Sequence, residues 1–173
     1  LGQVFMAVQV GRQADNELSL GTINLQGFGV DKRPAHARWL HHANLDWVVG
    51  TESQVRELSK KRFAGYAVRA TCLPKEKGGG RTGGVVHFFP SDWQKESKVR
   101  WREVMQGRIL VAEVDLDKPT WIVGAYSPAS DGEERKEFWK KMRALIEEAE
   151  SKWVMLLAGG DWNAVSDPAA ERN

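Results

Sequence analysis

With 173 residues and 42% hydrophobic content, the chain fits one domain and can supply a buried core. Its net charge of +2 lacks the strongly basic balance of many nucleic-acid-binding domains. Polyanion binding would therefore depend on local basic clusters at residues 60–62 and 98–102, which otherwise read as solvated faces. The eight tryptophans are many for this length; we expect most to pack in the core, while exposed ones could stack on nucleic-acid bases.

Cysteine content and hydropathy restrict the compartment. The single cysteine, Cys72, excludes an internal disulfide and a cysteine-rich zinc site. It falls in an expected strand and is predicted to be a buried thiol, which fits a reducing, intracellular compartment. No apolar run approaches the roughly 20 residues that span a bilayer, so no membrane partner is expected. The first ten residues lack the basic segment of a signal peptide.

The N-terminal residues read as an extension followed by the domain. Val4–Val10 alternates loosely and predicts a short strand, and the polar residues 11–17 are typical of a linker. We therefore expect residues 1–17 to form an N-terminal extension and residues 18–173 to form the domain. Apolar alternation predicts the first strand of that domain over residues 18–24.

The next segment predicts a helix and two strands. A glycine-bearing turn precedes Pro34, which opens a helix over residues 34–44. A short buried strand follows at residues 45–50. The polar residues 53–62 favour a short helix, and residues 66–73 favour another strand.

A glycine-rich loop and a hairpin occupy the middle of the chain. Residues 78–84 form a loop that is not a phosphate loop, because the Gly-Lys-Ser/Thr ending and the following helix are missing. Residues 85–89 predict a strand that Pro90 ends. Residues 108–114 and 120–125 predict two strands joined by a tight turn.

The clearest helix spans residues 131–150. Ser130 and Glu133 have the spacing of a capping box at its start. An apolar stripe at helical spacing predicts the buried face of this helix. Its members are Phe138, Met142, Leu145 and Ala149, reinforced by Trp139 and Ile146. A last strand follows at residues 154–158, and the mixed order predicts an α/β (α+β) sandwich with helices covering sheets.

Four apolar strands each finish on polar residues. The polar residues at these four strand ends are Asn24, Glu52, Tyr126, and Asp161 with Asn163. Any one of these could be ordinary loop chemistry, but strand ends that meet at one sheet edge build sites there. If the last strand stays extended, Asp161 and Asn163 lie on one face. The oxygen-rich set suits Mg²⁺ or Mn²⁺ rather than zinc, and so predicts metal-dependent phosphoester hydrolysis.

Several of these segments together resemble the endonuclease/exonuclease/phosphatase family. The resemblance covers residues 18–173 and implies a DNase I-like four-layer fold. The overall residue pattern is most similar to that of the endonuclease domains of non-LTR (LINE-type) retrotransposons, and this similarity includes the ending Asp167-Pro168-x-x-Glu171-Arg172. The matching motifs are Asn24-Leu25-Gln26-Gly27, Leu45 to Glu52, Gly83-Gly84-Val85-Val86, Gly107 to Leu110, Gly124 to Pro128, and Gly159-Gly160-Asp161-Trp162-Asn163.

The resemblance implies a role for each polar strand end. Glu52 would hold a divalent metal, Mg²⁺ or Mn²⁺, and Asn24 would support that metal and the phosphate. Tyr126 would donate a hydrogen bond to the scissile phosphate. Asp161 would orient or deprotonate the attacking water, and Asn163 would bind a phosphate oxygen.

The sequence also departs from the family pattern. Gln26 stands where asparagine is usual, and Glu52 follows Gly-Thr rather than Leu-Gln. The family's second catalytic aspartate and terminal Ser-Asp-His motif have no match before Asn173, so the fold is expected to be incomplete. The four histidines lie elsewhere and are expected to be structural or exposed; they are His36, His41, His42 and His87.

Three functions remain open. The first is a DNA-nicking phosphodiesterase domain of a retrotransposon-type protein, for which the resemblance implies DNA as partner and the nucleus as compartment. The second is a catalytically inactive remnant that acts as a binding module and forms a homo-oligomer, with Val4–Val10 as a candidate exchanged strand. The third is a phosphomonoesterase of the same superfamily.

Overall fold

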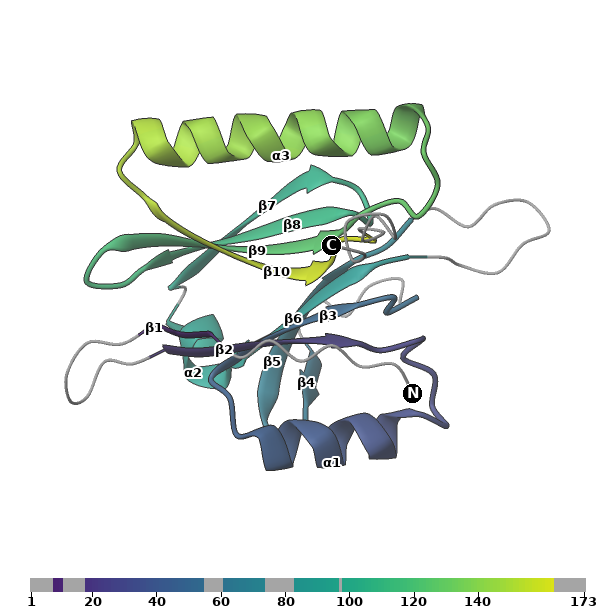
Figure 1. Cartoon of the computed structure of the whole chain (residues 1–173). Coiled ribbons are helices and arrows are strands. Elements are labelled where there is room, and N and C mark those ends of the chain that lie inside the picture. The colour runs from purple at the N-terminus through teal and green to yellow at the C-terminus, as the bar shows by residue number, and fades with distance from the viewer. Residues whose placement is uncertain (1–7, 11–17, 55–60, 74–82, 97, 164–173) are drawn as a thin grey trace, which may run out of the picture.

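Two β-sheets pack face to face between two long helices, which gives the four layers expected from the sequence (Figure 1). The computed structural model describes residues 8–10, 18–54, 61–73, 83–96 and 98–163. Most of the expected N-terminal extension, residues 74–82 of the glycine-rich region and the last ten residues lie outside this described part. The helices lie on the outer faces of the sandwich, and the core lies between each helix and its sheet and between the sheets.

The first sheet has six strands in the order β1-β2-β3-β6-β5-β4. Only β2 and β3 are parallel, and α1 (Arg33–Ala43) connects them. The short β1 pairs antiparallel with β2 of the same chain, so strand exchange stays a prediction. The strands are β1 (Val8–Val10), β2 (Leu18–Asn24), β3 (Trp47–Thr51), β4 (Lys61–Phe63), β5 (Tyr66–Thr71) and β6 (Val85–Pro90).

The second sheet has four strands in the order β10-β9-β8-β7. The hairpin between β8 and β9 confirms the tight turn predicted from the sequence. β9 and β10 are parallel, and α3 (Glu133–Ser151) connects them across the outer face. The strands are β7 (Val99–Met105), β8 (Ile109–Asp115), β9 (Pro119–Tyr126) and β10 (Met155–Asp161), and the short α2 (Ser91–Lys95) joins the two sheets.

The short helix expected at residues 53–62 is wrong in the part that the structure describes. Ser53 and Gln54 follow β3 without helical structure, and Lys61 already belongs to β4; residues 55–60 lie outside the described part. The reason is a competing set of backbone partners. The Ser53 and Gln54 N–H groups donate to the carbonyls of Gly84 and Gly83, which ties this segment to the strand beside it.

The capping box expected at the start of α3 is also wrong. The residue before the helix is Gly132, in extended conformation, and no side chain caps the helix. Ser130 therefore lies too far upstream to bond the first-turn amides. The buried stripe of α3 is confirmed at Phe138, Met142, Leu145 and Ala149, whereas Trp139 is 42% exposed and Ile146 is 43% exposed.

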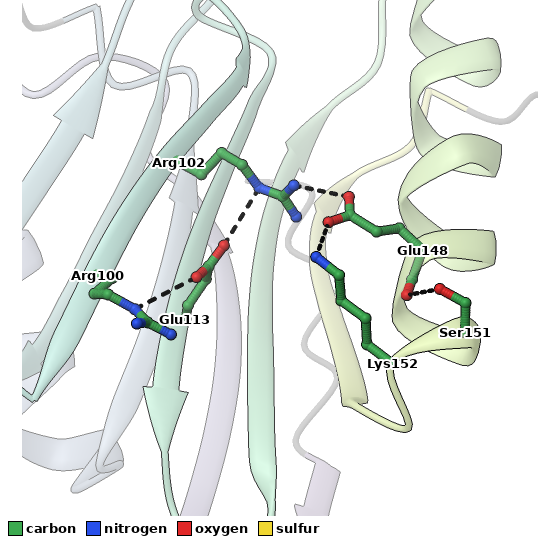
Figure 2. A network of polar contacts seen from close by, with 6 residues as sticks. All are labelled: Arg100, Arg102, Glu113, Glu148, Ser151 and Lys152. Carbon is green, nitrogen blue, oxygen red and sulfur yellow. Dashed lines mark hydrogen bonds and ion pairs between the residues drawn. The ribbon is translucent and has the colours of Figure 1, made fainter.

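The basic cluster at residues 98–102 lies mainly on β7, and its arginines are paired with acids rather than free for a polyanion. Arg100 and Arg102 both contact Glu113 of β8, at 3.6 and 3.4 Å (Figure 2). Arg102 also reaches Glu148 of α3 at 2.7 Å, and Lys152 joins the same carboxylate. This network ties α3 to its sheet through Arg102, which contacts both carboxylates, while Arg100 shares one of them from an exposed position. In the other cluster, Lys60 and the side chain of Lys61 lie outside what the structure describes.

Candidate active site

The ends of the two parallel strand pairs meet at one edge of the sandwich. Asn24 ends β2, and Asp161 ends β10 on the other sheet. The Asn24 Nδ2 group donates to Asp161 Oδ2 at 3.3 Å, which joins residues that are 137 positions apart. Tyr126 ends β9 directly beside Asp161 in the parallel register. The structure therefore brings together polar strand ends that the sequence placed in separate segments.

A glycine makes this approach possible. Gly160 precedes Asp161 and has φ +148°, and a Cβ atom there would lie 1.8 Å from the Ala125 carbonyl oxygen of β9. No other residue fits between the strands at this point. The Ser127 N–H group donates to the Asp161 carbonyl oxygen at 2.9 Å and holds the end of β10 against the end of β9.

Asp161 and Asn163 lie side by side, but through a turn rather than through an extended strand. β10 ends at Asp161, and Asn163 has φ +42°. The Asn163 N–H group donates to Asp161 Oδ1 at 3.0 Å, and its side-chain amide donates to the Ser127 carbonyl oxygen at 2.6 Å. The extended backbone expected from the sequence is therefore wrong past Asp161, because the Asp side chain captures its own downstream backbone.

Glu52 and Tyr126 form the second half of the site. Glu52 follows β3 with φ +53°, and its carbonyl oxygen accepts from the Gly27 N–H group at 2.7 Å. Partial burial raises the pKa of the Tyr126 phenol, and the negative charges of Glu52 and Asp161 raise it further. Arg108 acts in the opposite direction. Tyr126 therefore stays protonated at neutral pH and can donate a hydrogen bond.

Arg108 packs against the ring of Tyr126. It was not identified as a site residue from the sequence. Its guanidinium lies 4.9 Å from the centre of the Tyr126 ring and forms a forked pair with Glu134 of α3, at 2.9 and 3.2 Å. Its side chain is only 10% exposed. The only signal in the sequence was its position in the Gly107-Arg108 pair that starts β8. Arg135 of α3 adds a contact to the Asn163 carbonyl oxygen at 3.3 Å.

The donor set suits a hard divalent cation with open coordination positions. Glu52 and Asp161 supply two half-exposed carboxylates, and the Asn24 amide is held in place because its oxygen accepts from the Gln26 N–H group at 3.0 Å. Within the described residues, no group of three or more His, Cys, Asp or Glu side chains could hold a metal. The oxygen atoms of Glu52, Asp161 and Asn24 are of the kind that hard divalent cations use as ligands.

His87 is structural, as expected. It is fully buried between the sheets, accepts from Trp47 Nε1 at 2.9 Å, and its Nε2 lies 3.1 Å from the Leu110 carbonyl oxygen. Burial lowers the pKa of this imidazole to about 3. Cys72 is also buried, as predicted. No helix among the described residues is long and apolar enough to cross a membrane.

Comparison with known proteins identifies the fold. No protein-family profile and no curated protein matches the sequence. Solved structures do match: an AP endonuclease from Archaeoglobus fulgidus has a TM-score of 0.57 at 17% identity, over 87% of this chain and 59% of that one. TDP2 from Caenorhabditis elegans gives 0.59 at 13%, over 86% and 48%. A mannosyl-6-phosphatase from Bacteroides thetaiotaomicron gives 0.61 at 14%, over 86% and 66%.

These similarities show that the chain has the DNase I-like fold. The chain spans 59% of the length of the archaeal endonuclease. At identities below one fifth the similarity concerns the fold, while activity depends on the site built on it.

Proposed function

We propose that this chain is a metal-dependent phosphodiesterase that nicks DNA. One observation carries the proposal: Asn24 of one sheet donates to Asp161 of the other at 3.3 Å, directly beside the Tyr126–Glu52 pair. Two carboxylates, two amides and a protonated phenol at one edge can together bind a phosphodiester. The set contains no thiol or histidine that could act as the nucleophile. Phosphoryl transfer depends mainly on such positioning and on charge stabilisation.

Each residue then has a defined task. Asp161, oriented by Asn24, would hold or deprotonate the attacking water. The Tyr126 phenol would donate to a non-bridging phosphate oxygen, and the second N–H of the Asn163 amide would bind another. Glu52 would hold the Mg²⁺ or Mn²⁺ ion, with Asn24 in support. When bound, this ion supplies neutralisation of the charge that develops on the phosphate.

DNA is the substrate that the similar structures favour. Their descriptions include an AP endonuclease and a Neisseria 3′ phosphatase bound to a DNA hairpin. The finer proposal, a nicking domain of a retrotransposon-type protein acting in the nucleus, rests on the overall resemblance of the ordered motifs and on the ending at residues 167–172. Its last motif, residues 167–172, lies outside the described residues.

Nicking of supercoiled plasmid by the full chain with Mg²⁺ tests the proposal. We expect Glu52→Gln and Asp161→Asn each to lower the nicking rate by at least about 100-fold, because each removes one charge from the reacting site. Glu103→Gln, at an exposed position of β7, is the matched control and should leave the rate unchanged. Equal rates in all four proteins would refute the site.

A phosphomonoesterase activity is the second candidate. It is favoured by the TM-score of 0.61 with the mannosyl-6-phosphatase. Release of phosphate from a sugar phosphate, abolished by Asp161→Asn and without DNA nicking by the wild type, would establish it in place of the first.

An inactive module that associates with a second copy is the third candidate. Among the described residues β10 pairs only with β9, and Met155, Leu156 and Leu157 are half-buried there. Light scattering should give twice 19.4 kDa if this holds, and one chain mass if it does not.

A further inference from the structure

An aromatic surface continues from the site onto α3. Trp162 stands between Asp161 and Asn163, and its ring stacks on Trp139 of α3 with centroids 6.1 Å apart and planes 21° apart. Phe138, fully buried, meets the Trp139 ring edge-on at 5.2 Å. The Trp139 ring therefore packs against the protein on one side, while 42% of the residue is exposed to solvent. Because these contacts already hold the ring in place, a ligand that stacks on it does not have to order the side chain on binding.

The surroundings of Trp139 on the helix are basic. Lys136 and Arg143 lie three residues before it and four residues after it, so they border it on the same helix face. Lys136 pairs only with Glu133, in a contact where both side chains are more than two-thirds exposed. In the part of the chain that the structure describes, Arg143 forms no ion pair. This contrasts with Arg102, whose charge is balanced by Glu113 and Glu148.

We infer that Trp139, stacked on Trp162, is a platform for one unpaired base of a DNA strand, with Arg143 holding a neighbouring phosphate. The inference rests on the proposed DNA phosphodiesterase function and extends it to the substrate's form. An indole face stacks on any base, and the Arg143 guanidinium beside it, which forms no ion pair among the described residues, matches the phosphate backbone. A base inside a duplex has both faces covered by its neighbours, so only an unpaired base can use this surface. The strand around the scissile bond would then be partly single-stranded.

Binding of a fluorescein-labelled single-stranded oligonucleotide, measured by anisotropy with EDTA present, tests the platform without cleavage. We expect Trp139→Ala to weaken binding about tenfold, because stacking on one aromatic ring is lost. Trp139→Phe keeps an aromatic face and should stay within about threefold of wild type. Trp153→Ala is the matched control: Trp153 is 91% exposed, lies after the other end of α3, and should leave binding unchanged.

Salt dependence separates the phosphate contact from the stacking contact. Arg143→Gln should reduce the slope of log affinity against log salt by about 0.7, the value for one lost contact to a single strand. Trp139→Ala should leave that slope unchanged. A duplex of the same sequence should bind Trp139→Ala and wild type equally.

Three results would overturn the inference. The first is that Trp139→Ala and Trp153→Ala bind the single strand with equal affinity. The second is that Trp139→Ala loses as much affinity for the duplex as for the single strand. The third is that Trp139→Ala changes the molecular mass of the protein without changing its DNA affinity, which would make Trp139 a protein contact. Plasmid nicking with Mg²⁺ is read separately. Wild type that binds through Trp139 but nicks no faster than Asp161→Asn refutes the proposed function alone, and wild type that nicks while Trp139→Ala binds normally refutes the platform alone.

Discussion

The fold contains the same strand–helix–strand unit twice, and the two copies hold their halves of the site by different means. β2–α1–β3 leads to Glu52, and β9–α3–β10 leads to Asp161. In the first unit all five residues of β3 are buried, whereas α1 buries only Leu40 among its 11 residues. In the second unit α3 buries four of 19 residues, while β10 buries only Gly159.

The difference follows from where each strand lies in its sheet. β3 is flanked by β2 and β6, so the sheet alone fixes the segment that carries Glu52. β10 has only β9 beside it in the described part of the chain, and its end is held by hydrogen bonds from Ser127 and Asn24, with α3 contacting the residues around it. Glu134 fixes Arg108 beneath Tyr126, and Arg135 contacts Asn163. One carboxylate follows a strand that is paired on both sides, and the other ends a strand that is paired on one side and has α3 contacts around it.

The largest effect should come from the close strand contact in the second unit. Gly160→Ala would place a methyl group 1.8 Å from the Ala125 carbonyl oxygen, which belongs to the backbone and cannot move aside as the end of a flexible side chain can. We expect a loss of about 3 kcal/mol or more in the free energy of unfolding. Gly159→Ala meets only side-chain atoms at 3.7 Å and should cost less than about 1 kcal/mol. Urea denaturation of both variants measures this, and similar midpoints would contradict it.

The two helices should respond differently to loss of one leucine. Leu40→Ala and Leu145→Ala each remove a buried side chain and should each cost about 2–5 kcal/mol. Leu40 is the only buried residue of α1, so its loss should also raise amide hydrogen exchange throughout that helix. α3 keeps three other buried residues and should stay protected in Leu145→Ala. Equal protection of both helices would remove the distinction drawn between the units.

Arg108 tests whether the helix-held half of the site depends on α3. Arg108→Gln removes the fork to Glu134 and the charge under Tyr126, and should lower the nicking rate about tenfold, or about 1.4 kcal/mol in the barrier. Arg102→Gln breaks the similar network of Figure 2, away from the strand ends that carry the site, and should leave the rate unchanged at a temperature where the variant is folded. Nicking by Arg108→Gln at the wild-type rate would show that Tyr126 needs no support.

The pH dependence of stability tests the joint between the sheets. Buried His87 has a pKa of about 3 when folded and near 6.5 when unfolded, so below pH 6.5 the unfolded chain binds a proton that the folded chain does not. Stability should fall with pH from 6.5 towards 3, by up to about 1.4 kcal/mol per pH unit. Denaturation midpoints between pH 7 and 5 should fall less steeply in His87→Gln than in wild type. His36, whose pKa is also lowered by burial, provides the comparison variant His36→Gln.

The layered fold and most elements of both units could be predicted from the sequence, because their patterns are local. The apolar stripe of α3, the β8–β9 hairpin and the buried run of β3 each show their period within a few residues. The errors arose where a partner far along the chain decides the structure. Ser53 avoids a helix because Gly84 offers its carbonyl, and Trp139 finds its stacking partner, Trp162, 23 residues later in the chain.

The candidate site shows the same limit. Strand ends such as Asn24 and Asp161 were identifiable because apolar runs stop there, although their roles stay predictions. Arg108 was missed because its partners, Glu134 and Tyr126, come 26 and 18 residues later and no local spacing links them. β7 was missed because its burial alternates only weakly, with exposed Arg100 and Glu103 among half-buried neighbours.

The contact between Asn24 and Asp161 also sets an order of events in time. These residues leave the ribosome 137 positions apart, so most of the first sheet is available to fold while β10 has yet to be made. β10 must then close a long loop through α3 to reach its parallel partner, the kind of pairing that forms slowly. The two halves of the site therefore meet only after β10 has been made, and a nascent chain that has not released Asp161 carries an incomplete site.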